Sequence, residues 1–96
     1  MSKRGRSSDV RERENSKLII KGVDSNGKAF SEHTETFDIS ETGVSFFLQN
    51  PIWVDTHLTV EITSSELFDS PQKVGAKVVR VKVDPSGRQF VAVRFD

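Results

Sequence analysis

The chain has 96 residues, 14 cationic and 14 acidic side chains, and no cysteine. This length supports one domain, and a composition with 34% hydrophobic residues, including seven Phe and one Trp, excludes a wholly disordered chain. Disulfides and thiolate metal sites are excluded, and no segment has the apolar length of a membrane span or a secretory signal, so we expect a cytoplasmic protein without membrane insertion.

Residues 1–13 form a basic segment with no strand or helix pattern. They carry five Lys or Arg side chains against two acidic ones, a net charge of +3, which leaves −3 on the remaining residues. We therefore expect a flexible N-terminal arm at residues 1–13 and one folded domain at residues 14–96. A local cationic arm can hold a small anion, whereas zero net charge argues against DNA or RNA as a partner.

The folded domain begins with a predicted β-hairpin. Residues 17–22 read as a short strand, and Asn26-Gly27 is a strong two-residue hairpin signal. The return strand, residues 29–37, is mostly polar and carries Phe30 and Phe37 on opposite faces, which indicates an edge or well-solvated strand.

A third strand is predicted at residues 44–48. Phe46 and Phe47 point to opposite faces, so one should be in the core and the other partly exposed. Pro51 then ends the strand, because proline has no N–H for the ladder. Trp53 follows, and we expect it to be an apolar plug at a barrel rim.

Two longer patterns follow. Residues 58–63 alternate between apolar and polar side chains, which predicts a strand with one buried face. Residues 64–72 read as a polar connection with one helical turn. In residues 73–83 the alternation changes phase between Val78 and Val79, which predicts a β-bulge or a bend.

The last strand follows a turn at residues 84–87 and directs Val91, Val93 and Phe95 inward. Six short antiparallel strands joined by hairpin signals predict an all-β barrel or sandwich. A six-stranded antiparallel β-barrel is the better interpretation, because closure removes edge strands that a thin core cannot protect.

The polar sequence from Asp38 to Gly43 lies between two of these strands. A carboxylate at Asp38 can accept two hydrogen bonds from the Watson–Crick edge of guanine. Ser40 offers a hydroxyl to a base or phosphate, and Gly43 permits a left-handed turn and a close approach of backbone to ligand. The alternative is a plain hairpin turn, in which Asp and Ser bond their own backbone and Gly ends the turn.

This Asp-x-Ser-x-x-Gly spacing, followed by Val-Ser-Phe-Phe-Leu, resembles the PilZ domain, a family of small bacterial β-barrels that bind cyclic di-GMP. Gly-Ala-Lys-Val-Val-Arg-Val at residues 75–81 and Phe-Val-Ala-Val-Arg-Phe at residues 90–95 resemble the family's closing strands. The resemblance implies a PilZ-like β-barrel with little or no helix. It implies no cofactor, with cyclic di-GMP as ligand, and it assigns Asp38, Ser40 and Gly43 to the ligand site.

The family's second motif, Arg-x-x-x-Arg before the first strand, is imperfect here. Arg11 matches the second arginine, and the first position falls on Ser7, one residue after Arg6. The resemblance assigns phosphate and guanine binding to Arg11 and to Arg6, which can substitute if the arm shifts or bulges. Arg13-x-x-x-Lys17 has the right spacing, but an ammonium cannot reproduce the bidentate guanidinium fork.

Catalysis and metal binding are not expected. His33 and His57 are isolated, and Ser40 lacks a nucleophile-elbow sequence. The resemblance implies a non-catalytic cyclic di-GMP receptor whose arm orders over the barrel on binding and which signals to a separate effector protein. The alternatives are a degenerate PilZ-like domain that acts as a protein interaction adaptor, and a generic RNA-binding barrel, against which the zero net charge argues.

Overall fold

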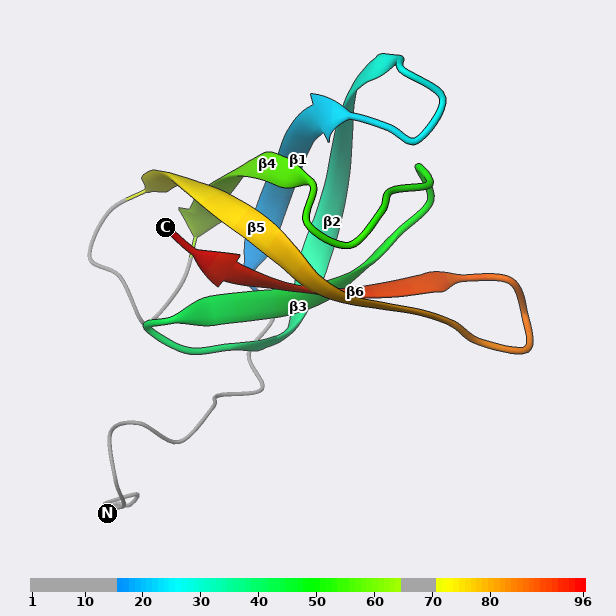
Figure 1. Ribbon diagram of the computed structural model, residues 1–96. Helices are drawn as coiled ribbons and strands as arrows, with labels where there is room; N and C mark the ends of the chain where they lie inside the picture. Colours follow the sequence, from blue (N-terminus) through cyan, green and yellow to red (C-terminus); the bar gives the residue numbers. More distant parts are fainter. Residues whose placement is uncertain (1–15, 65–70) are drawn as a thin grey trace.

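The computed structural model in Figure 1 describes residues 16–64 and 71–96. They form six β-strands: β1 (Lys17–Val23), β2 (Ala29–Ile39), β3 (Gly43–Leu48), β4 (His57–Ser64), β5 (Gln72–Val83) and β6 (Gln89–Phe95). Every pairing is antiparallel, and the strands close into a barrel in the order β1-β2-β3-β6-β5-β4. The predicted all-β, six-stranded antiparallel barrel is confirmed, and the part of the chain that the structure describes contains no helix.

The core fills the barrel with alternate residues of all six strands, as the period-two side-chain pattern of a strand requires. Its fully or nearly buried apolar residues are Leu18, Ile20, Ile39, Val44, Phe46, Leu48, Ile52, Leu58, Val60, Ile62, Ala76, Val78, Val91 and Val93. Phe46 is buried, whereas Phe47 lies on the outer face, so the prediction for this pair is confirmed. Each buried Leu, Ile, Val or Phe side chain stabilises the fold by about 1.5–3 kcal/mol.

Three register shifts interrupt the ladders of the described strands: one lies between β1 and β4 beside Lys17, and the other two change which side chains face outward. The register of β5 against β6 shifts between Val78 and Arg80, which confirms the predicted irregularity at Val79. A second shift, between Thr36 and Asp38, makes Phe37 the extra residue of β2 against β3. The bulge at Phe37 was not predicted, and it matters because it brings two consecutive side chains, Phe37 and Asp38, to the outer face of the barrel.

β2 differs from the prediction in one respect. It is well solvated but is not an edge strand throughout, because it pairs with β1 from Ala29 to Glu35 and with β3 from Thr36 to Ile39. Where β2 and β3 diverge, the Glu32 carboxylate accepts hydrogen bonds from the backbone N–H groups of Gln49 and Asn50, at 2.8 and 3.1 Å. Side chains thus replace the missing backbone ladder at this end of the barrel.

The β1–β2 and β5–β6 hairpins have turns of the same kind, each with a glycine at positive φ. In the β1–β2 turn, Gly27 has φ +82° and its N–H donates to the carbonyl oxygen of Asp24. In the β5–β6 turn, Gly87 has φ +91° and bonds Asp84 in the same way. Glycine suits both positions because a side chain is strained at positive φ. The predicted turns at these positions are confirmed.

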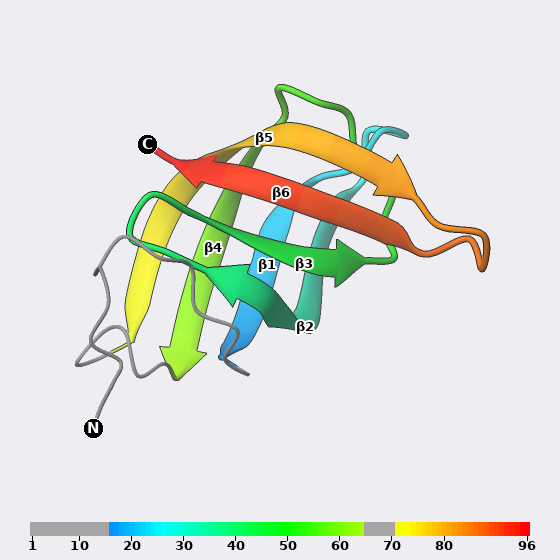
Figure 2. The same ribbon diagram turned by 90° about the horizontal axis from the view of Figure 1, so that it is seen from below.

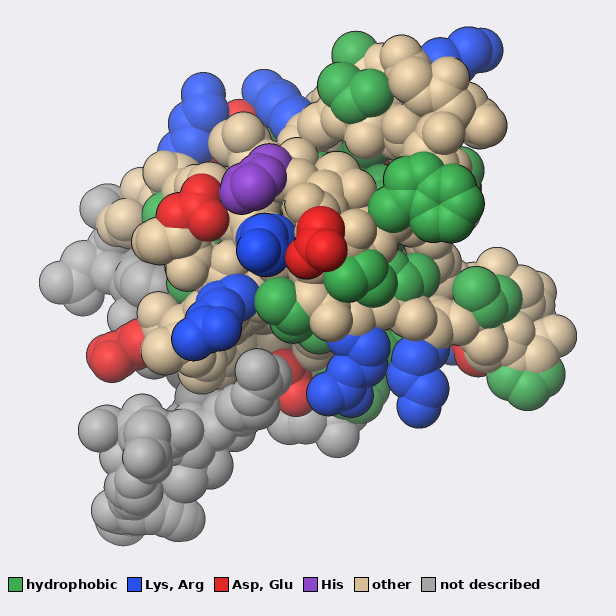
Figure 3. Space-filling view, in the orientation of Figure 1, with side chains coloured by type: hydrophobic (Ala, Val, Ile, Leu, Met, Phe, Trp, Pro, Cys, Tyr) green, Lys and Arg blue, Asp and Glu red, His purple; other side chains and the backbone are tan. Residues whose placement is uncertain are grey.

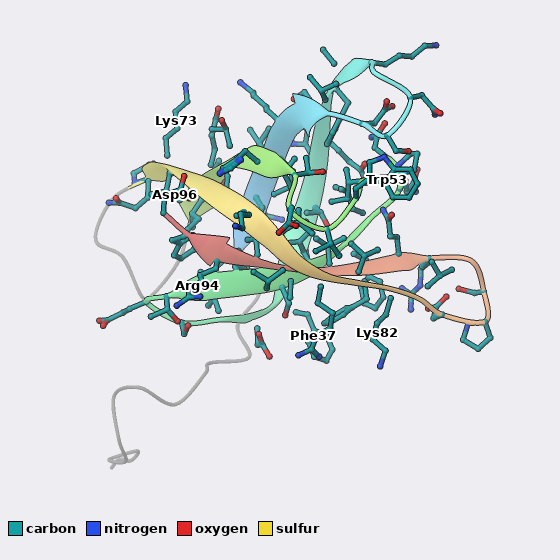
Figure 4. All side chains as sticks on the ribbon, in the orientation of Figure 1. Phe37, Trp53, Lys73, Lys82, Arg94 and Asp96 are labelled. Atoms are coloured by element: carbon teal, nitrogen blue, oxygen red, sulfur yellow. The ribbon has the colours of Figure 1, made fainter. Side chains whose placement is uncertain are left out.

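Trp53 lies in the β3–β4 connection and is 68% exposed (Figure 4), so the expectation of a buried plug was wrong. Ile52, its neighbour, is buried instead. The N-terminal arm at residues 1–13 and most of the predicted polar connection at residues 64–72 lie outside the described residues. Within those that are described, no helix is long and apolar enough to cross a membrane.

Candidate ligand-binding site

The C-terminal end of β2 and the start of β3 carry the predicted polar site on the outer face of the barrel. The Ser45 hydroxyl donates a 2.8 Å hydrogen bond to Oδ1 of Asp38, its cross-strand partner. Ser45 is 3% exposed and Asp38 is partly buried. The pair therefore holds one carboxylate in a defined orientation, and a carboxylate can accept about four hydrogen bonds in all.

Ser40 lies in the tight turn that joins β2 to β3. Its N–H donates to the carbonyl oxygen of Gly43 at 2.9 Å. Its hydroxyl oxygen accepts from the N–H of Thr42 at 3.2 Å and lies 3.1 Å from the Thr42 hydroxyl. Ser40 thus shapes the turn, as the plain hairpin interpretation requires, and this turn directly follows the end of β2 that carries Asp38.

Gly43 has a different role from the one expected. Its φ is not positive, since Gly27 and Gly87 are the glycines with positive φ in the described part of the chain. A Cβ at this position would overlap the backbone carbonyl oxygen of Val93 and lie 3.3 Å from Cα of Arg94. The small residue therefore allows β3 to approach β6 closely, and no left-handed turn is involved.

Closure of the barrel places β6 and β5 beside this turn, as Figure 2 shows for β3 and β6. Gly43 pairs with Arg94, and Ser45 pairs with Ala92, which in turn pairs with Arg80 of β5. Ser45 and Ala92 thus place small side chains next to Asp38, with Ser45 buried and Ala92 partly exposed. Arg94 and Arg80 are exposed and form no ion pair within residues 16–64 and 71–96.

The other residues that the sequence singled out add no described side chain to this face. Arg6 and Arg11 lie outside the described residues. Lys17, from the alternative arginine–lysine pair, makes an exposed 3.5 Å ion pair with Glu35 on β2. His33 and His57 are exposed on β2 and β4, and the described residues contain no cluster of three metal-ligating side chains.

Three polar residues of this face were not predicted from the sequence: Ser45, Arg80 and Arg94. Strand alternation already placed Ser45 and Arg94 on the outer faces of their strands. The pairing of β3 with β6 could not be read from the sequence, because Gly43 and Arg94 are 51 residues apart and two other strands lie between them in the chain. The order of strands around the barrel was needed to find them.

Comparison with known proteins supports one family. The profile of the PilZ domain family matches residues 6–96. The structure of the Bacillus subtilis inhibitor of motility (MotI/DgrA) superposes with a TM-score of 0.72 at 19% identity and covers 100% of this chain and 48% of that one. The chain thus spans about half the length of that protein.

A second similar structure is the PilZ domain with c-di-GMP of YcgR from Escherichia coli. It superposes with a TM-score of 0.59 at 10% identity, over 90% of this chain and 74% of that one. No curated protein sequence matches the chain significantly. Because the family profile extends over nearly the whole sequence and the strands close into the same kind of barrel, the chain belongs to the PilZ domain family.

Proposed function

We propose that the chain is a non-catalytic receptor for cyclic di-GMP and that the ligand binds on the outer face at the β2–β3 turn. The observation that carries this proposal is the Asp38 carboxylate, which the Ser45 hydroxyl holds in place beside the small side chain of Ala92. Membership of the PilZ family and the similarity to the c-di-GMP-bound domain of YcgR support it.

Asp38 has the chemistry to select guanine. The N1–H and N2–H₂ groups of guanine form a donor pair that matches the width of a carboxylate. Adenine presents no such donor pair on that edge, so it would not satisfy a carboxylate in the same place. Ala92 places a small, partly exposed side chain beside Ser45, and Arg94 lies next to Gly43 as a candidate for phosphate binding.

Arg6 and Arg11 would complete the site from the N-terminal arm. A guanidinium group can bind guanine through N7 and O6 or pair with a phosphate. In this proposal residues 1–13 order over the outer face when ligand binds, and this ordering is the signal read by a separate effector protein.

Calorimetric titration with cyclic di-GMP tests the proposal. Asp38→Ala and Arg11→Ala should each weaken binding about tenfold or more, because a charged hydrogen bond contributes about 1.5–3 kcal/mol. Glu35→Ala is the matched control, since it removes a carboxylate from the outer face of the same strand, three residues from Asp38. Its affinity should equal that of the unmodified chain, and GTP should give no saturable heat.

A PilZ-like adaptor without nucleotide affinity is the second candidate. It is favoured by the engagement of the Ser40 hydroxyl within its own turn and by the extra residue between Arg6 and Arg11. No heat at high micromolar cyclic di-GMP, together with an unchanged melting temperature, would select this candidate over the receptor.

A further inference from the structure

Three phenylalanines from different strands form a cluster on the outside of the barrel. The ring of Phe90 lies 5.3 Å from Phe37 and 5.2 Å from Phe47, and Phe37 and Phe47 lie 6.4 Å apart, all in edge-to-face arrangements. Such aromatic contacts stabilise the cluster beyond the burial of apolar area. They fix the rings in place, yet Phe37 remains 39% exposed.

The aromatic cluster and the β5–β6 hairpin together line an open groove. The groove has a volume of about 420 Å³, and Lys82, Val83 and Pro85 line it together with the rings. Val83 is 68% exposed. Figure 4 shows Phe37 and Lys82 projecting from the same side of the barrel, below β3 and β6. An apolar groove with exposed aromatic and aliphatic side chains is typical of an interaction site.

The groove is cationic at its rim. The guanidinium carbon of Arg88 lies 4.0 Å above the Phe47 ring, and Nε of Arg88 makes a 3.2 Å ion pair with Asp84. Lys82 makes no ion pair with any described residue, and Arg80, two residues earlier on β5, makes none either. Lys and Arg side chains extend below the hairpin in Figure 3.

Charge decides what kind of occupant fits. Asp84 is the acidic residue of the groove lining, and Ser86 and Arg88 already engage both of its oxygens. Around the groove, three cations, Arg80, Lys82 and Arg88, outnumber Asp84 and the adjacent Asp38, so the local net charge is positive and attracts negative charge. The apolar rings, by contrast, need a nonpolar anchor to exclude water.

We infer that this groove is the docking site for an acidic segment of a partner protein that inserts an aliphatic or aromatic side chain among Phe37, Phe47 and Phe90. The anchor side chain covers the rings, and flanking carboxylates pair with Lys82 and Arg80. The groove adjoins the Asp38–Ser45 pair, since Phe37 precedes Asp38 in the β2 bulge and Phe47 lies two residues after Ser45. It is a different surface from that pair, and the inference holds whether or not cyclic di-GMP binds.

Selection from a random-peptide display library on the full chain tests the inference. The expected peptides combine Asp or Glu with Leu or Phe, and their affinity falls as the salt concentration rises. Phe37→Ser should weaken the selected peptides about tenfold or more, as loss of a central anchor contact does. Lys82→Glu, at an exposed position where the fold is not at risk, should weaken the same peptides without changing the melting temperature.

Trp53→Ser is the matched control, because it removes an exposed aromatic ring outside the groove lining, and it should leave peptide affinity unchanged. Basic selected peptides, or acidic peptides that bind Phe37→Ser and Lys82→Glu normally, would overturn the inference. It is also overturned if no peptide is enriched and Phe37→Ser weakens cyclic di-GMP instead, because the groove would then serve a nucleotide base.

Discussion

Gly43 illustrates how a residue of a ligand motif can be required for packing. Its backbone lies against the Val93 carbonyl and Cα of Arg94, so any Cβ must push β3 away from β6. We expect Gly43→Ala to lower the free energy of unfolding by about 1–3 kcal/mol, the usual range for overpacking. Urea denaturation would measure the change.

The comparison variant for Gly43→Ala is Gly75→Ala. Its Cβ would meet Oδ2 of Asp96, the end of an exposed side chain that can move aside. We therefore expect a smaller loss at Gly75 than at Gly43. Equal losses at the two positions would show that contact with the β6 backbone is not the cause.

Two carboxylates link stability to pH. Hydrogen bonding from the Ser86 hydroxyl, with further bonds from Arg88, lowers the pKa of Asp84 in spite of opposing desolvation. A 3.0 Å bond from Lys21 lowers the pKa of Glu61. A lowered folded-state pKa stabilises the protein above the unfolded value, about 3.9 for Asp and 4.3 for Glu, and this stabilisation is lost as pH falls through the folded value.

Asp84→Asn should therefore lower the melting temperature most above about pH 5, where the Asp84 carboxylate of the unmodified chain is charged in both the folded and the unfolded state. The difference from the unmodified chain should shrink as pH falls below about 4. Thermal unfolding monitored by circular dichroism across this range measures it. A difference that stays constant from pH 6 to about pH 2 would contradict a charge-dependent role of Asp84.

At the scale of the strand, the bulge at Val79 bends β5, which pairs with two neighbouring strands. β5 pairs with β4 from Gln72 to Lys77 and with β6 from Ala76 to Val83. Deletion of Val79 would leave the inward and outward alternation intact but would straighten the strand. We expect this deletion to destabilise the barrel by more than about 1 kcal/mol, as changes to buried backbone geometry do.

Val79→Ala separates the bulge from the side chain that occupies it. Val79 is 46% exposed, so its truncation should change the free energy of unfolding by no more than about 0.5 kcal/mol. Chemical denaturation of both variants tests the role of the bulge. A deletion variant as stable as the unmodified chain would mean that β5 bends without it.

The bulges at Val79 and Phe37 differ in how far the sequence can reveal them. At Val79 the apolar alternation of β5 changes phase, so the irregularity is visible in the sequence itself. β2 is mostly polar and has no continuous apolar alternation to interrupt, so the bulge at Phe37 left no signal. The strands that bury one face were predictable because this burial produces alternating apolar and polar residues in the sequence.

At the scale of the whole molecule, closure of the barrel creates surfaces whose residues come from strands that are not joined in one hairpin. The β3–β6 pairing brings Arg94 beside Gly43, and the same closure brings Phe90 between Phe37 and Phe47. Asp38, Ser40 and Gly43 form a motif that is visible in the sequence, whereas the Ser45 partner of Asp38 and the aromatic cluster depend on strand order and register. These long-range pairings were not deducible from local patterns.

Backbone amide chemical shifts during a titration with cyclic di-GMP test the proposed site most directly. We expect saturable changes at residues 38–45 and at Ala92 and Arg94, together with changes at residues 6–11 as the arm closes. Amides of β1 and β4 on the opposite side of the barrel should not respond. Saturable changes confined to β1 and β4, or no change at high micromolar ligand, would contradict a cyclic di-GMP site on the outer face at the β2–β3 turn.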